Sequence, residues 1–359
     1  MKARDISILG IDSGIVASTG ILSSGDAGLV TVNARTITIS STGAKAGEIG
    51  TNTFGAGNAG AVTVTAQDIV LEGGGTIGSE SQGAGNAGTV TVNVSDSFTI
   101  AGSSPAGPSG VRARTDGVGT GGNILVTAGD MSISDGAAIT SESDGAARAG
   151  DIDVRVTNAL RLTNGAITTE AQSADGGNIT IAVGQVVELL NSQVTTTVSG
   201  GVGGGGDISI DPVFVIVNGS TIRANAVGGN GGNITIVGDF ILTEGSTIQA
   251  TSALAVDGTI SFESANTDIS GSLVVLDSAF ADASTQLKAR CEERRGAVGG
   301  RFARGSGGGP RLRPGDPYAL SYLMHLVPQR RRQPNARAEP PRNLFKVSGM
   351  ALVALNCAA

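Results

Sequence analysis

The sequence predicts an all-β protein, a right-handed three-faced parallel β-helix in which the chain winds into stacked coils. Three observations predict it. Glycine is abundant, with 57 in 359 residues. Short runs of Val, Ile and Thr alternate with polar residues, which is the period of a strand. These runs recur at a nearly fixed interval, which is the signature of a solenoid that grows along one axis without dividing into separate cores.

The repeat begins with a glycine that is followed by a short alternating strand, such as TVTVNV after Gly88 and NITIAV after Gly177. Successive glycines are 26 to 34 residues apart, and the longest interval contains the two prolines of 103–109, where we expect an insert. The repeat glycines are Gly28, Gly60, Gly88, Gly122, Gly150, Gly177, Gly206, Gly232 and Gly258.

Each repeat of about 27 residues holds three short strands, as the segments Asn233–Val237, Asp239–Thr243 and Ser246–Thr251 illustrate. Gly, Asn and Asp lie between the strands, and these residues tolerate the left-handed conformations of sharp turns. Three strands and three turns make one coil. Because stacked strands lie about 4.8 Å apart, nine coils would make a rod on the order of 40 Å long.

The third strand of each coil has a predicted inside and outside, because side chains two residues apart point the same way. One inward position is always Ile or Val, and the next inward position is always small. The large row is Ile49, Ile77, Val111, Ile139, Ile167, Val194, Ile222 and Ile248. The small row is Thr51, Ser79, Ala113, Ser141, Thr169, Thr196, Ala224 and Ala250.

The outward position one residue after the small row contains the candidate site residues. It reads Asn52, Glu80, Arg114, Glu142, Glu170, Thr197, Asn225 and Thr251. Glu142 and Glu170 could form a cation site or a carboxylate pair. The alternative, which we favour, is a solvated ladder in which Arg114 pairs with its neighbours. We therefore predict no metal ion and no cofactor, with Glu142 and Glu170 as weak metal candidates.

Asn and Asp also recur beside the repeat glycine, for example at Asn58, Asn86, Asp151, Asn178 and Asp207. A calcium site would need a repeated Gly-Gly-x-Gly-x-Asp pattern, to which 203–207 and 228–233 come near. The favoured alternative is turn chemistry, in which these side chains bond local backbone.

Enzymatic activity is not expected, although parallel β-helices also include polysaccharide lyases and hydrolases. Such sites need clustered carboxylates or bases, often beside aromatic rings. The chain has no Trp, and His325, Tyr318 and Tyr322 all lie near the C-terminus. We interpret the scattered phenylalanines as packing residues; they include Phe54, Phe98, Phe214, Phe240 and Phe262.

Charge divides the chain. Residues 1–287 hold 10 of the 24 Lys and Arg and 27 of the 31 Asp and Glu, so they carry a net −17. Residues 288–359 carry a net +10. The acidic part gives no reason to expect nucleic acid as a partner. No apolar run is long enough to span a bilayer, and no signal peptide follows Met1. We expect any export signal to lie on upstream sequence.

The phrases GNAGTVTVNV at Gly85–Val94 and GSTIRANAVGGNGGNITI at Gly219–Ile236 resemble a known family, as does DGTISFESANTDISGSLVVL at Asp257–Leu276. The resemblance, over about residues 4–295, is to the C-terminal repeats of filamentous-haemagglutinin-like exoproteins of the two-partner secretion pathway. It implies export through an outer-membrane transporter barrel, folding outside the cell, and adhesion to glycans or proteins on host or neighbouring cells. It also implies that this chain is a C-terminal fragment of a longer exoprotein. Two alternatives remain, a carbohydrate-active enzyme and a passive structural stalk.

The predicted domain boundaries follow from where the repeat ends. The β-helix is expected over 1–276, and Asp277–Arg295 is expected to be an amphipathic helix that covers the open last coil. Cys291 would then be a buried residue of that helix or a thiol for intermolecular pairing. Residues 296–359, which include Cys357, are rich in Gly, Pro and Arg and are expected to be disordered.

Overall fold

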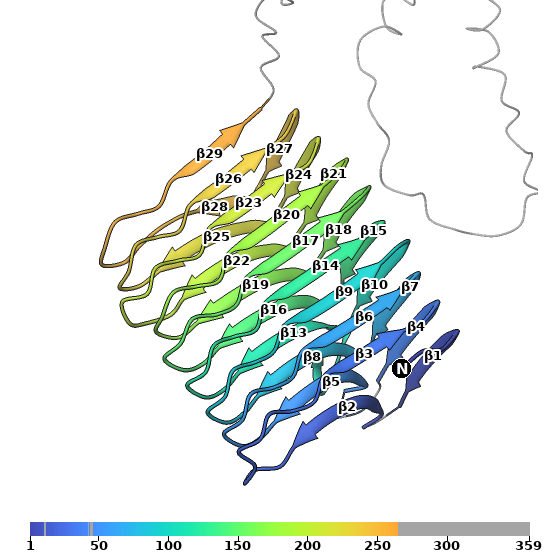
Figure 1. The fold of residues 1–359 in the computed structure, drawn as a ribbon. Coiled ribbons are helices and arrows are strands. Elements are labelled where there is room, and N and C mark those ends of the chain that lie inside the picture. The colour runs from blue at the N-terminus through green and yellow to red at the C-terminus, as the bar shows by residue number, and fades with distance from the viewer. Residues whose placement is uncertain (11, 42, 44–45, 265–359) are drawn as a thin grey trace, which may run out of the picture. The chain divides into compact units, whose positions relative to one another are not determined.

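A computed structural model describes residues 1–10, 12–41, 43 and 46–264. Contacts divide the chain into the units Met1–Asp268 and Ile269–Ala359, and the fold described below belongs to the first. Three parallel sheets, each of nine strands, run side by side through this unit (Figure 1). In the described residues no helix could span a membrane.

The strands form nine coils, each of which passes through sheet B, then sheet C, then sheet A. Sheet B contains β1 Asp5–Leu9, β4 Thr36–Ser40, β7 Asp68–Glu72, β10 Ser97–Ala101, β15 Asp130–Ser134, β18 Ala159–Thr163, β21 Val186–Leu190, β24 Phe214–Asn218 and β27 Phe240–Glu244. Sheet C contains β2 Gly14–Thr19, β5 Glu48–Thr53, β8 Thr76–Ser81, β13 Gly110–Thr115, β16 Ala138–Ser143, β19 Ala166–Ala171, β22 Gln193–Val198, β25 Thr221–Ala226 and β28 Thr247–Gln249. Sheet A contains β3 Val30–Asn33, β6 Val62–Ala66, β9 Val90–Val94, β14 Ile124–Ala128, β17 Ile152–Val156, β20 Ile179–Val183, β23 Ile208–Asp211, β26 Ile234–Val237 and β29 Ile260–Glu263.

The prediction of a three-faced parallel β-solenoid is confirmed over the described residues. The right-handed sense of the coil stays a prediction. The capping helix expected at Asp277–Arg295 and the tail 296–359 lie outside the described residues, as do Cys291 and Cys357.

The interior of the solenoid is filled by aligned rows of aliphatic side chains. The predicted large row of sheet C is in register from Ile49 to Ile248. Its members from Ile49 to Ile222 have no exposed surface. Burial of each such side chain contributes roughly 2 kcal/mol, so this row is a main source of stability.

The predicted small row is also buried, and its hydroxyl groups have a specific task. Ser79 Oγ donates to the carbonyl of Gly60 at 3.0 Å and accepts from the amide of Gly88 at 2.8 Å. Thr169 and Thr196 donate instead to the carbonyls of the repeat glycines that follow them, Gly177 and Gly206. A small hydroxyl residue therefore ties sheet C to the turn that carries the repeat glycine.

The repeat glycines stack directly on one another, because the chain backbone passes very close to itself at this corner. A Cβ built at Gly177 would overlap the carbonyl of Gly150, and one built at Gly206 would overlap the carbonyl of Gly177. The same holds for each step from Gly60 to Gly258. Neither Gly177 nor Gly206 has a positive φ, so close approach and not backbone conformation requires glycine here.

The turn from sheet B to sheet C does require a left-handed residue. Asp135, Asn164 and Asn191 occupy it with φ between 50° and 57°, and Gly219 and Gly245 occupy it in later coils. These are the residue types that the sequence pattern assigned to corners. The expected insert is a small antiparallel hairpin, β11 Ser103–Ser104 with β12 Gly107–Pro108.

Candidate functional site

The candidate site is the outer face of sheet C, where all the charged residues of the predicted outward ladder lie. Strand pairing puts Asn52, Glu80, Arg114, Glu142 and Glu170 opposite one another in consecutive coils. The predicted ladder is thus confirmed from Asn52 to Asn225, and Thr251 lies beyond the last paired residue of β28. The order of the ladder follows from the fixed register of β5, β8, β13, β16 and β19, because a shift of one residue would turn these charges into the core.

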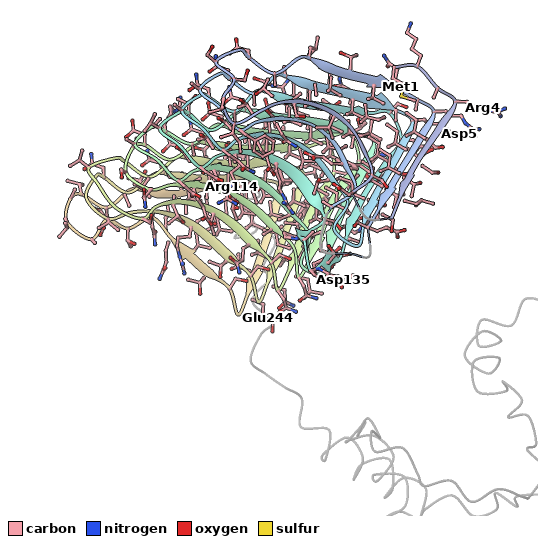
Figure 2. The ribbon with its side chains drawn as sticks, turned by 90° about the horizontal axis from the view of Figure 1, so that it is seen from below. Met1, Arg4, Asp5, Arg114, Asp135 and Glu244 are labelled. Carbon is pink, nitrogen blue, oxygen red and sulfur yellow. The ribbon has the colours of Figure 1, made fainter. Side chains whose placement is uncertain are left out.

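Arg114 neutralises the middle of this ladder. Its Nε lies 2.7 Å from Asp116 Oδ1 and 3.5 Å from Glu142 Oε2, and its Nη2 lies 2.8 Å from Asp144 Oδ2. Figure 2 labels Arg114 among the side chains drawn on the ribbon. Arg114 thus pairs with its neighbours as predicted, but the ladder is not fully solvated, because the Glu142 side chain is only 26% exposed.

Glu142 and Glu170 are adjacent, as predicted, but they gather no third ligand. Burial raises the pKa of Glu142, and repulsion from Glu170 and Asp144 raises it further, while Arg114 opposes the shift. Within the described residues, no group of three or more His, Cys, Asp or Glu side chains could hold a metal ion. Glu170 lines a small pocket of about 120 Å³ together with Asp144, Gln172 and Thr197.

The most perturbed carboxyl group of this face is Glu48, which sequence reasoning missed. Burial and repulsion from Glu80 raise the pKa of Glu48 to about 7. The side chain folds over Gly50 of its own strand, where a Cβ would overlap Glu48 Oε1. Gly50 pairs with Gly78, so neither coil places a side chain of its own at this outward position, and the Glu48 side chain covers Gly50. Glycine at the same outward position of two neighbouring strands was the signal in the sequence for this arrangement.

The Nδ2 of Asn52 donates a hydrogen bond to the Oε2 of Glu48 at 3.1 Å. The Oδ1 of Asn52 is buried and has no hydrogen-bond partner among the residues that the structure describes. A carboxyl group with this pKa exchanges a proton near neutral pH, so it could act as a general acid or base if a substrate reached it.

The Asn and Asp residues of the turns form two ladders, and they bond the next coil instead of local backbone. The turn-chemistry interpretation is corrected in this respect. In the longer ladder, Asn178 Oδ1 accepts from the amide of Asp207 at 2.9 Å, and Asp207 Oδ1 accepts from the amide of Asn233 at 2.7 Å. In-register stacking places the equivalent amide one coil away within reach. The shorter ladder is Asp26, Asn58, Asn86 and Thr120, and the longer is Asn123, Asp151, Asn178, Asp207, Asn233 and Thr259.

The interpretation of the phenylalanines as packing residues holds for Phe98, which is 1% exposed, and is wrong for Phe214 and Phe240, which are 44% and 54% exposed. The reason lies in their parity: Phe98 shares the inward row of sheet B with Ile69 and Met131, whereas Phe214 and Phe240 occupy an outward row. Phe262 shares the inward row of sheet A with Ile236 and is half exposed in β29, the last described strand. Phe54 follows the end of β5 and is 39% exposed.

The fold and this face define a class of protein, a parallel three-sheet β-solenoid whose outer faces carry ladders of side chains. Comparison with family models, with curated proteins and with solved structures gives no match to the chain.

Proposed function

We propose that this chain is a non-catalytic segment of a secreted or cell-surface filamentous adhesin. The observation that supports the proposal most directly is the unbroken register of the three sheets over nine coils. The fixed register repeats each outward position once per coil, and regularly spaced positions suit multivalent binding to a repetitive surface. The expected partners are glycans or proteins on host or neighbouring cells.

The route of export and the ends of the solenoid belong to the same proposal. The route rests on the sequence resemblance, which implies an outer-membrane transporter barrel as a partner. The helical cap at Asp277–Arg295 rests on the amphipathic pattern of that segment. A parallel solenoid suits such a route, because coils can stack one after another as the chain emerges.

The experiment uses the full chain immobilised on beads and fluorescent bacterial or host cells. We expect the beads to retain the cells and the soluble chain to compete with retention. Equal retention by beads that carry the heat-unfolded chain would contradict an adhesin. In that outcome the chain would be a passive stalk, the alternative that the solenoid alone also allows.

One observation favours a second candidate, a carbohydrate-active enzyme, and it is the raised pKa of Glu48 beside Glu80. The test is release of reducing sugar from a panel of bacterial and plant polysaccharides by the purified chain. Activity that disappears in Glu48→Gln and persists in Glu72→Gln, an exposed carboxylate on sheet B, would support the enzyme. No release by the folded wild-type chain would reject it.

A further inference from the structure

An apolar patch lies on the outer face of sheet B in the last three described coils. It is formed by outward residues of the neighbouring strands β21, β24 and β27 (Figure 1). Phe214 is 44% exposed, Phe240 54% and Leu242 64%. We call this surface the sheet B patch; its members are Val186, Leu190, Phe214, Ile216, Phe240 and Leu242.

The same rows of sheet B are mostly polar in the earlier coils. The row that ends in Ile216 and Leu242 begins with Ser7 and Thr38. The row that ends in Phe214 and Phe240 begins with Asp5. In β24 both faces of the strand are apolar, since Val215 and Val217 fill the interior. Strands that are apolar on both faces are typical of sheets covered on both sides.

A groove borders the patch at the corner between sheets A and B. It has a volume of about 720 Å³, and its lining includes the apolar residues Val183, Pro212 and Val213. Three exposed carboxylates line it, those of Asp211, Asp239 and Glu263.

The opposite edge of the patch carries one carboxylate, that of Glu244, beside Asn218 and Leu190. Glu244 follows Leu242 at the end of β27, and Figure 2 labels it in the last coil. Glu188 lies between the patch residues Val186 and Leu190 and pairs with Arg161. Residues 191–264 contain six carboxylates and a single Lys or Arg, which is Arg223 in β25 of sheet C.

These features distinguish three kinds of occupant for the patch: a sugar, a second copy of this chain, and a basic polypeptide segment. The rings of Phe214 and Phe240 stack on each other, 5.2 Å apart and 9° from parallel, so their faces are turned to each other and not outward to a sugar. A second copy of the same patch would bring acidic edges together, and like charges repel. A segment with an apolar centre and basic flanks matches both the patch and its edges.

We propose that the sheet B patch and the adjoining groove bind a basic amphipathic polypeptide segment of a partner protein. Apolar side chains of the partner cover Phe214, Phe240 and Leu242 and enter the groove. Its Lys or Arg side chains meet Asp211, Asp239 and Glu263. This inference goes beyond the proposed function, because it needs neither a cell surface nor a repetitive ligand.

The test measures binding of the full chain to a fluorescein-labelled 14-residue amphipathic helix of Leu and Lys by fluorescence anisotropy. A peptide with Glu in place of every Lys serves as the charge control. We expect the wild-type chain to bind the Leu/Lys peptide saturably and not to bind the Leu/Glu peptide. The affinity for the Leu/Lys peptide should fall at least tenfold in F240S/L242S. In the wild type it should also fall at high salt. D239N/E263Q should lower the affinity and flatten the salt dependence.

The matched control is Val70→Ser, because Val70 occupies the same outward row as Leu242 in an earlier, polar coil. It should bind the peptide like the wild type. Unchanged binding in F240S/L242S, or no binding by the folded wild-type chain, overturns the proposal. A dimer seen by light scattering and lost in F240S/L242S would overturn it in favour of a second copy. Flotation with phosphatidylcholine vesicles, lost in the same variant, would overturn it in favour of a lipid surface.

Discussion

At the scale of single residues, the carboxyl of Glu48 links the fold to pH. Its pKa in the folded chain is about 7, compared with an ordinary value of 4.5. The folded state therefore holds this proton more strongly than the unfolded state does. The resulting stabilisation is complete at pH 4 and is lost as the pH rises from about 4.5 through 7.

We therefore expect Glu48→Gln to raise the unfolding midpoint in urea at pH 8 and to leave it nearly unchanged at pH 4. The difference at pH 8 should be on the order of 1–3 kcal/mol, because each pKa unit corresponds to about 1.4 kcal/mol. Glu72→Gln, on an exposed side chain of sheet B, is the control. A Glu48→Gln variant with the pH dependence of the wild type would contradict the burial of this group.

Single residues also determine the stability of the longer turn ladder. In this ladder Asn and Asp alternate through Asn123, Asp151, Asn178, Asp207 and Asn233. Asn178→Asp would place carboxylates in three consecutive coils. We expect it to destabilise the fold by about 1 kcal/mol or more at low salt, and high salt should restore part of that loss. Asn178→Ala, which removes only a hydrogen bond, should cost about 1 kcal/mol without salt dependence. Equal salt responses of the two variants would contradict this prediction.

At the scale of the elements, the column of repeat glycines determines how closely two coils can approach. Gly177→Ala would push a methyl group into the Gly150 carbonyl. We expect a loss of about 1–3 kcal/mol or more, the usual range for overpacking, measured by urea unfolding. Gly20→Ala is the matched control, because a Cβ there would meet nothing within 4 Å and Gly20 has no positive φ. An unchanged free energy of unfolding in Gly177→Ala would show that the backbone at this corner can move apart to accommodate a methyl group.

The elements were largely predictable, and the reason is their repetition. Period-two alternation gave the strands, and parity gave the inward row from Ile49 to Ile248 and the outward ladder from Asn52 to Thr251. The hydroxyl bonds of Ser79 and Thr169 to glycine carbonyls were not predictable, because a small residue near a corner satisfies the pattern whether or not it donates.

At the scale of the whole unit, stability should vary along the stack, because each coil is supported by its neighbours. Inner-row residues of the middle coils, such as Ile139 and Val154, are fully buried, whereas Ile15, Ile241 and Ile248 near the two ends are only partly buried. We expect amide hydrogen exchange to be slowest in β13–β20 and faster in β1–β3 and β27–β29. Uniform protection along the stack would mean that the described unit unfolds as one cooperative block.

The sequence by itself determined the solenoid, its three strands per coil, and the inside and outside of sheet C. Periodicity and parity are local properties of the sequence, and they recur in every repeat. Only the tertiary structure decided which side chains meet between coils. It placed Glu48 against Glu80, joined Asn178 to the amide of Asp207, and stacked Phe214 on Phe240 at the outer surface. Those contacts depend on the register between residues 26 to 34 positions apart, and register is set by the core of all nine coils together.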